Sequence, residues 1–179
     1  MSSSSNSRTA RRRFCLALAA WPLAGLADMA PESPVAGMRR WGSGRFRRFG
    51  FHVYDATLWS LGDDPTRPPL ALRLTYQRHI AGRDLADASV REMRRFTADE
   101  ARLKDWGETM RGLFPDVRPG DALLGIHWPG LASFHLNGRE IGRVADPEFA
   151  RHFFAIWLDP RTSAPDLREA LLKRDAGAS

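Results

Sequence analysis

The residues best suited to chemistry in this chain of 179 residues are arginines and a tyrosine on segments of strand-like composition. Five arginines fall within ten positions that contain no acidic residue: Arg39, Arg40, Arg45, Arg47 and Arg48. The planar guanidinium group can meet a carboxylate through two parallel hydrogen bonds, so this segment is suited to holding an anion. The alternative interpretation of each arginine is a solvated strand face.

Side chains alternate between the two faces of a strand, which narrows the choice of candidate ligand-binding residues. On a strand through this segment, Arg45 and Arg47 would share one face and Arg48 would lie on the other face. Farther along the chain, Tyr76 and Arg78 share a face, where a phenol beside a guanidinium could clamp an oxyanion. They could equally form the polar rim of a core strand. We therefore name as candidate ligand-binding residues Arg45, Arg47, Tyr76 and Arg78.

Other chemistry has little support in the sequence. The five histidines are scattered with no pair at metal-ligand spacing, and the only cysteine is Cys15. Gly42-Ser43-Gly44 lacks the third glycine of a dinucleotide-binding loop, and no serine sits in a nucleophile elbow. The sequence therefore predicts no metal site and no cofactor, and it assigns no catalytic residue.

Residues 1–27 resemble an export signal peptide. A polar, basic start leads into the apolar run Phe14–Ala27, which is interrupted by Pro22 and is too short to span a membrane. Small residues precede a plausible cleavage point after Ala27. Arg11-Arg12-Arg13-Phe14 resembles the twin-arginine pattern, with the general export route and a disordered basic tail as alternatives. We expect a periplasmic or secreted protein with no integral membrane anchor after cleavage.

The net charge of +6 is concentrated in this leader. Residues 1–27 carry four arginines and no acid, so the remainder has 23 of the 27 basic residues against all 21 acidic ones. A nearly balanced domain lacks the electrostatic footprint of a nucleic-acid-binding protein. We expect no nucleic-acid partner.

The clearest structural signals lie between positions 121 and 158. Asn137-Gly138 predicts a tight hairpin between strands Leu131–Leu136 and Arg139–Val144, because both central residues of such a turn need positive φ. Asp146-Pro147 then predicts the start of a helix. Its apolar residues recur at helical spacing and demand burial: Phe149, Phe153, Ile156 and Trp157. A hairpin followed by such a helix implies an antiparallel sheet with helices on one side.

The remaining elements follow from periodicity and capping. Strands are predicted at Phe49–Trp59, at Leu70–His79, where Leu70, Leu72, Leu74 and Tyr76 point one way, and at Ala122–Trp128. Two helices fill Gly82–Phe114, with Asp84 capping the first and Thr97 or Asp99 the second, and a last helix capped by Ser163 or Asp166 ends near Leu172. The predicted organisation is a leader at 1–27, an extended linker at 28–40, one domain at 41–173 and a frayed tail at 174–179.

The strings GSGRFRRFGFHVYDATLW, LALRLTYQRHI, FPDVRPGD, FHLNGREIG and DPEFARHFFAIWLDPRTSAPDLREALL resemble bacterial chalcone isomerase-like proteins. The resemblance covers Trp41 to Leu172. It implies an α+β fold, an open-faced β-sandwich in which helices cover one face of a large antiparallel sheet. The family's ligand-binding arginine follows a Gly-x-Gly stretch, and here Arg45 and Arg47 both follow Gly42-Ser43-Gly44.

The resemblance leaves three functions open. Related plant isomerases close a flavanone ring without a cofactor, which would make this chain an intramolecular lyase acting on a phenolic ligand. Other relatives bind fatty acids without catalysis, holding the carboxylate with an arginine and a tyrosine. A structural or partner-binding domain with a filled core is the third possibility. We expect non-catalytic binding of a fatty acid or a similar small apolar carboxylate, which a cavity beside Arg45 or Arg47 would support.

Overall fold

A computed structural model describes residues 35–174 of the chain. The predicted leader, residues 28–34 of the linker and residues 175–179 of the tail lie outside this range. The described part contains six strands and four helices: β1 (Arg39–Arg48), β2 (Phe51–Ser60), β3 (Leu70–Tyr76), α1 (Gly82–Met93), α2 (Glu100–Leu113), β4 (Ala122–Trp128), β5 (Leu131–Leu136), β6 (Arg139–Val144), α3 (Pro147–Leu158) and α4 (Pro165–Leu172).

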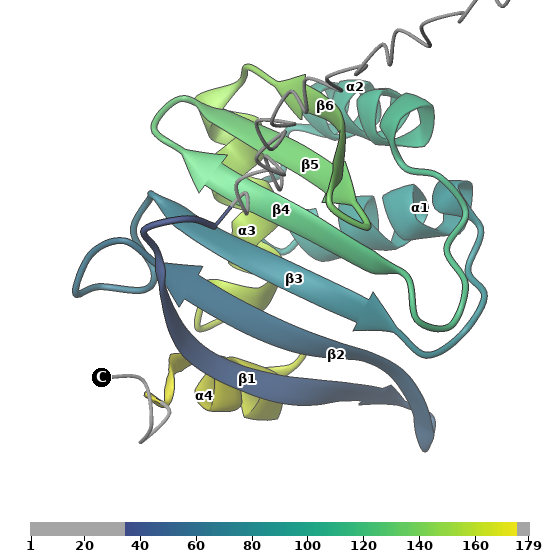
Figure 1. Ribbon diagram of the computed structural model, residues 1–179. Helices are drawn as coiled ribbons and strands as arrows, with labels where there is room; N and C mark the ends of the chain where they lie inside the picture. The colour runs from purple at the N-terminus through teal and green to yellow at the C-terminus, as the bar shows by residue number, and fades with distance from the viewer. Residues whose placement is uncertain (1–34, 175–179) are drawn as a thin grey trace, which may run out of the picture. The chain divides into compact units, whose positions relative to one another are not determined.

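The six strands form one antiparallel sheet in which each strand pairs with the next along the chain, in the order β1 to β6. The four helices lie on one face of this sheet, and the other face is turned toward the viewer in Figure 1. In β3, alternate residues Leu70, Leu72, Leu74 and Tyr76 are buried, as their period predicts. The predicted α+β open-faced sandwich is confirmed.

Two of the four helices are capped by residues that the sequence predicts. The Asp146 carboxylate accepts hydrogen bonds from the backbone N–H groups of Glu148 and Phe149, and Asp99 accepts one from Arg102. For α1 the predicted start at Gly82 is confirmed, but the predicted Asp84 cap is wrong, because the helix begins two residues before Asp84.

There the Gly82 N–H donates to the Asp116 carboxylate at 2.8 Å, so a distant side chain replaces a local cap. The α4 start was also predicted wrongly. Ala164, not Ser163 or Asp166, precedes the helix, and Pro165 occupies its first turn.

The first hairpin differs from the prediction of one strand at Phe49–Trp59. β1 begins at Arg39, inside the expected linker, and a turn at Phe49-Gly50 separates it from β2. Both turn residues have positive φ, 51° and 81°, as do Asn137 and Gly138 in the β5–β6 hairpin. The chain therefore makes the same kind of turn twice, once with residues that favour it and once with a phenylalanine at the first position.

Two glycines decide which face of β1 meets the helices. A Cβ atom on Gly44 would lie 2.8 Å from the Leu167 side chain, and one on Gly42 would collide with the backbone of Leu171. The sheet edge can approach α4 so closely only because these positions lack side chains. Gly42, Gly44, Phe46 and Arg48 consequently share the helix-facing side of β1.

The inner side of the sheet is packed solidly at the β4–β5 end. Phe134 on β5 is fully buried, and its ring centre lies 5.2 Å from that of Phe114 and 5.1 Å from that of Phe153. Phe149 stacks on Phe153 at 5.6 Å and meets Trp106 edge to face. This aromatic cluster anchors α2 and α3 to the sheet.

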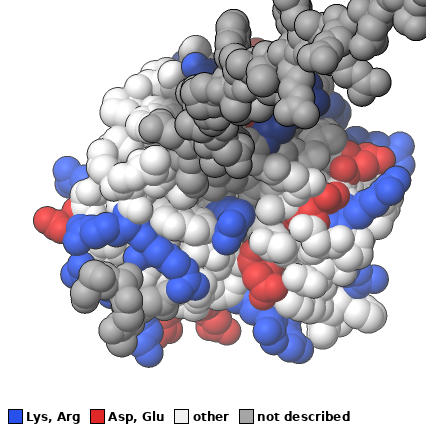
Figure 2. Space-filling view, in the orientation of Figure 1, with Lys and Arg blue, Asp and Glu red and all other residues white. Residues whose placement is uncertain are grey.

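The open face of the sheet is mixed in character. Ala71, Leu124 and Ile126 form a small apolar cluster there, against which Val35 and Met38 pack. Basic and acidic side chains are interspersed over the rest of this side (Figure 2). The open face therefore has both a small buried patch and a solvated, charged surface.

Candidate functional site

A cavity of about 510 Å³ lies on the helix-covered side of the sheet, at the end opposite the aromatic cluster. This volume falls within the ~300–1,000 Å³ typical of small-molecule sites. Its walls come from β1 to β4, α1, α3 and the segment just before α4, and most of them are apolar. The apolar wall includes Phe46, Val53, Leu74, Ile80, Leu85, Phe114, Leu123, Phe153, Ile156 and Trp157.

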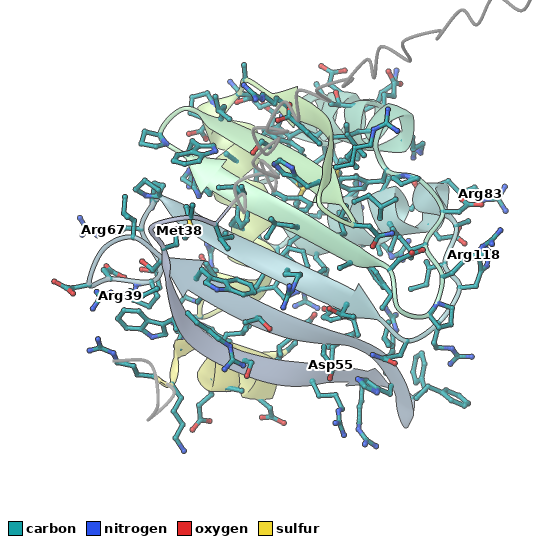
Figure 3. All side chains as sticks on the ribbon, in the orientation of Figure 1. Met38, Arg39, Asp55, Arg67, Arg83 and Arg118 are labelled. Carbon is teal, nitrogen blue, oxygen red and sulfur yellow. The ribbon has the colours of Figure 1, made fainter. Side chains whose placement is uncertain are left out.

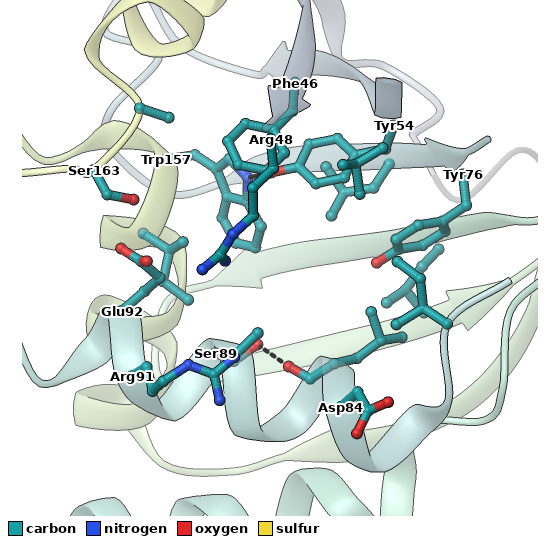
Figure 4. A pocket seen from close by; sticks show the side chains of 18 of the residues that line it. Phe46, Arg48, Tyr54, Tyr76, Asp84, Ser89, Arg91, Glu92, Trp157 and Ser163 are labelled. Atoms are coloured by element: carbon teal, nitrogen blue, oxygen red, sulfur yellow. Dashed lines mark hydrogen bonds between the residues drawn. The ribbon is translucent and has the colours of Figure 1, made fainter. Parts of the chain in front are cut away.

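Two tyrosines bring polar atoms into this apolar space (Figure 4). The Tyr54 hydroxyl accepts a hydrogen bond from the Trp157 indole N–H at 3.0 Å, and its ring stacks on Phe46 with centres 4.9 Å apart. Tyr76 is 3 % exposed, and its hydroxyl points into the cavity. Among residues 35–174 no side chain or backbone group bonds the Tyr76 hydroxyl, which is therefore free to donate to a ligand.

Burial controls the protonation of both tyrosines. Loss of solvation raises the pKa of Tyr54 above its ordinary value, and the Trp157 hydrogen bond opposes this only in part. Burial also raises the pKa of Tyr76, and the neighbouring Tyr54 adds to that shift. Both phenols stay protonated through the neutral range, so they act as hydrogen-bond donors and not as bases.

Charged groups gather at the cavity wall formed by α1 and the end of β1. The Arg48 side chain enters from β1 and Arg91 lies on α1 (Figure 4). Arg95, just after α1, also lines this wall. The two acids of this wall are occupied: Glu92 pairs with Arg95 at 3.0 Å and Asp84 with Arg83 at 3.6 Å. Within the described residues no carboxylate pairs with Arg48 or Arg91, so this wall has cationic groups to offer an anion.

The structure separates the four predicted binding residues. Tyr76 lines the cavity, whereas Arg45, Arg47 and Arg78 do not. Arg45 lies on the open face of the sheet and contacts Asp55 at 3.4 Å, and Figure 3 shows Asp55 on that face. Arg47 shares this face and is exposed.

Arg78 follows the end of β3, and its guanidinium lies 4.6 Å from the centre of the Phe51 ring. The predicted pairing of Tyr76 with Arg78 on one face is wrong because β3 ends at Tyr76. The chain leaves the strand geometry at that point, and strand alternation no longer applies.

The expectation that Arg45 or Arg47 faces the cavity is corrected in the same way. Gly42 and Gly44 press against α4, so the even-numbered residues of β1 from Gly42 onward point inward, and the arginine that reaches the cavity is Arg48. Periodicity placed Arg48 opposite Arg45 and Arg47 but could not tell which face was the inner one.

A register shift on β2 adds further residues that the sequence did not reveal. Phe46 pairs with Tyr54 but Arg47 pairs with His52, so Val53 is an extra residue in β2. Val53 and Tyr54 therefore both line the cavity although they are adjacent in the chain. The spacing of aromatic residues in β2 gave no sign of this bulge.

A second hollow lies on the far side of α3, where Thr66, His127, Glu148 and Arg151 are among its lining residues. It is larger, about 710 Å³, but more open to solvent, and the Glu148 and Arg151 charges on its wall pair with each other at 2.6 Å. The cavity that holds Tyr54 and Tyr76 is the better candidate because it combines an apolar wall with free polar groups.

Residues 35–174 contain neither a cluster of metal-ligating side chains nor a membrane-spanning helix. No three His, Cys, Asp or Glu side chains gather where they could hold a metal ion. No helix in this range has the length and apolar character needed to cross a bilayer.

Comparison with known proteins agrees with the fold. Residues 42–173 match the family model described as chalcone isomerase-like. The chain belongs to the chalcone isomerase-like family. An uncharacterized protein of Haemophilus influenzae is 28 % identical over 142 residues, which cover 78 % of this chain and 70 % of that protein.

A solved structure shares the architecture of this family member. The crystal structure of a fatty-acid binding protein of Arabidopsis thaliana superposes with a TM-score of 0.57, covering 79 % of this chain and 90 % of that one. The two sequences are 16 % identical, so the likeness concerns the fold. The family match at residues 42–173 includes the residues that line the cavity.

Proposed function

We propose that this protein binds a fatty acid, or a similar small apolar carboxylate, in the cavity lined by Tyr54 and Tyr76. The carboxylate meets the Arg48 guanidinium and the Tyr76 hydroxyl, and the chain of the ligand lies among the aromatic and aliphatic wall residues. The observation that carries the proposal is the free hydroxyl of buried Tyr76, which points into an apolar space that a cationic side chain also enters.

The charges of the wall favour an anionic ligand. Glu92 and Asp84 are each engaged by a neighbouring arginine, while Arg48 has no acidic partner among residues 35–174. A carboxylate supplies that partner and accepts the tyrosine hydrogen bond at the same time. A neutral apolar ligand would leave the Tyr76 hydroxyl without a partner after water is displaced, which costs free energy.

The groups present support binding more than catalysis. The tyrosines are protonated donors because burial raises the pKa of each. Neither histidine nor cysteine is among the described residues that line the cavity, and the Ser89 hydroxyl is committed to the Leu85 carbonyl at 2.9 Å. The fatty-acid binding protein with the same fold adds support from outside the chain.

The proposal places this binding outside the cytoplasm. The basic start and the apolar run Phe14–Ala27 support export, with cleavage after Ala27. Expression in the native host followed by mass spectrometry of the exported fraction should find a chain that begins at Asp28. A full-length chain confined to the cytoplasm would contradict this part of the proposal.

Titration calorimetry with a long-chain fatty acid tests the proposed binding. Delipidated protein should bind one ligand, and Arg48→Gln should weaken affinity by about 10- to 100-fold, which corresponds to the ~1.5–3 kcal/mol of a hydrogen bond to a charged group. Native mass spectrometry of freshly purified protein should show a co-purified ligand.

Arg45→Gln is the matched control because it removes the same charge from the same strand on the opposite face. It should leave affinity unchanged. Equal losses from Arg45→Gln and Arg48→Gln would place the carboxylate elsewhere, and the absence of binding by the wild-type protein would refute the proposed function.

A further inference from the structure

The tip of the β1–β2 hairpin exposes two aromatic side chains to solvent. Phe49 is 87 % exposed and Phe51 is 59 % exposed, and the hairpin extends past the ends of the neighbouring strands (Figure 1). Both rings lie at the same end of the hairpin, at and just after its turn. Single exposed apolar residues are ordinary, but two aromatic rings on a projecting turn form a distinct surface.

The backbone conformation of Phe49 shows that this residue does not stabilise the fold. Its φ of 51° lies in the left-handed region, which a bulky residue adopts only at a cost of conformational energy. Asn137 occupies the equivalent position in the β5–β6 hairpin with a φ of 50°, and asparagine suits that geometry. Phe49 therefore strains its turn without gaining burial in return, which points to a role outside the folded domain.

The side chains around the tip are basic. Arg48 lies 5.3 Å from the centre of the Phe49 ring, and Arg78 lies 4.6 Å from that of Phe51. Arg47 is also exposed on β1. Within the described residues these three arginines have no acidic partner, whereas Asp55, the nearest acid along β2, is engaged by Arg45 and His52.

We propose that this tip, residues 47–51 together with Arg78, docks on an anionic lipid surface. Phe49 and Phe51 enter the boundary between headgroups and acyl chains, and Arg47 and Arg78 contact lipid phosphates. Aromatic rings flanked by cations are suited to this boundary because one part is apolar and the other seeks negative charge. A projecting turn with no flat apolar area around it suits a fluid lipid layer better than the packed interface of a protein partner.

The tip is continuous with the cavity. The Arg48 side chain lines the cavity wall and also lies over the Phe49 ring. A lipid surface bound at the tip would thus place the source of an apolar ligand beside the cationic wall of the cavity. The idea that docking delivers a ligand to the cavity rests on the proposed function. Docking itself does not, because it can be measured in protein that carries no ligand.

Co-flotation with vesicles tests the docking directly. Delipidated protein should bind vesicles of phosphatidylcholine mixed with phosphatidylglycerol, more weakly in high salt, and should bind poorly to vesicles of phosphatidylcholine alone. Phe49→Asn should lower the partition coefficient by about tenfold or more, the effect of losing one inserted aromatic ring. Arg78→Gln should lower it about fivefold, as expected for one cation near an anionic surface.

Phe49→Asn also separates docking from folding. Asparagine is preferred at positive φ, so the variant should melt about 2–4 °C higher while it binds vesicles less well. Leu61→Asn is the control: Leu61 is 52 % exposed just past the other end of β2, and its loss should leave vesicle binding unchanged.

Two results would overturn the inference. One is equal vesicle binding by the wild type and Phe49→Asn, and the other is failure of the wild type to bind mixed vesicles at all. Neither result depends on fatty-acid affinity in the cavity, which calorimetry without vesicles measures separately.

Discussion

The two ends of the space between sheet and helices are built differently. At one end Phe134 fills the space completely and contacts three other phenylalanines: Phe114, Phe149 and Phe153. At the other end Tyr54 and Tyr76 replace this kind of packing, and a cavity of about 510 Å³ remains. The two ends share some walls, since Phe114 and Phe153 belong to both. The comparison indicates that close packing at one end stabilises the fold, so that the other end can hold a cavity for a ligand.

The largest expected effect comes from breaking the filled end. Phe134→Ala should lower the free energy of unfolding by about 3–5 kcal/mol, because a fully buried ring leaves a void that its neighbours cannot close. Leu85→Ala, at the partly exposed wall of the cavity, should cost clearly less. Chemical denaturation measures both values, and equal losses would show that the two ends are packed alike.

A smaller loss of stability should follow from adding a side chain where β1 contacts α4. Gly44→Ala adds a methyl group that would lie 2.8 Å from the Leu167 side chain and 2.9 Å from the Ala170 Cβ. Overpacking of this kind costs about 1–3 kcal/mol. Thermal unfolding should show the loss, and Gly62→Ala, where nothing lies within 4 Å of an added Cβ, is the control. A neutral Gly44→Ala would mean that this contact does not fix the inner face of β1.

A substitution at the end with the cavity should change ligand affinity and leave the free energy of unfolding unchanged. Tyr76→Phe removes one hydroxyl that has no hydrogen-bond partner in the described part of the protein, so unfolding should be unchanged. Affinity for a fatty acid should fall by about 0.5–1.5 kcal/mol, the value of one hydrogen bond. Calorimetry and denaturation on the same variant decide this, and unchanged affinity would remove Tyr76 from the site.

Lowering the pH should reduce the stability of the folded protein through His127 while leaving the cavity unaffected. This is the smallest of the expected effects. Burial lowers the pKa of His127, which stacks on Phe154 at 5.0 Å, below the ordinary value of 6.5. The unfolded chain therefore binds a proton more readily than the folded one. The stability contributed by neutral His127 is fully present above pH 6.5 and falls as the pH drops below that value toward the lower folded pKa.

His127→Gln should flatten this part of the stability profile. Fatty-acid affinity should change little over the neutral range, since Tyr54 and Tyr76 keep their protons there. A wild-type stability that does not fall between neutral and mildly acidic pH would contradict the account of His127.

Much of the fold follows from local patterns in the sequence. The Asn137-Gly138 turn, the Asp146 cap and the apolar alternation of β3 are signals that a few adjacent residues complete by themselves. β1 was harder to predict because its five arginines and two glycines have little strand propensity. Its strand geometry depends on pairing with β2 and on contact with α4, both distant in the chain.

Only part of the candidate site could be predicted, because its other residues depend on contacts that are distant in the chain. Tyr76 lies at the end of a clean alternating strand, and its inward direction could be predicted. The choice between Arg45 and Arg48 depends on which face of β1 is covered, and only the approach of α4 to Gly44 decides that. Tyr54 enters the site beside a bulge, which alternation alone does not reveal.

The most direct test of the central claim is a crystal structure of the protein with a long-chain fatty acid bound. The account predicts electron density for the ligand inside the cavity, with its carboxylate beside the Arg48 guanidinium and the Tyr76 hydroxyl. A ligand on the open face beside Arg45, or a cavity filled by rearranged side chains with no ligand in it, would contradict the account.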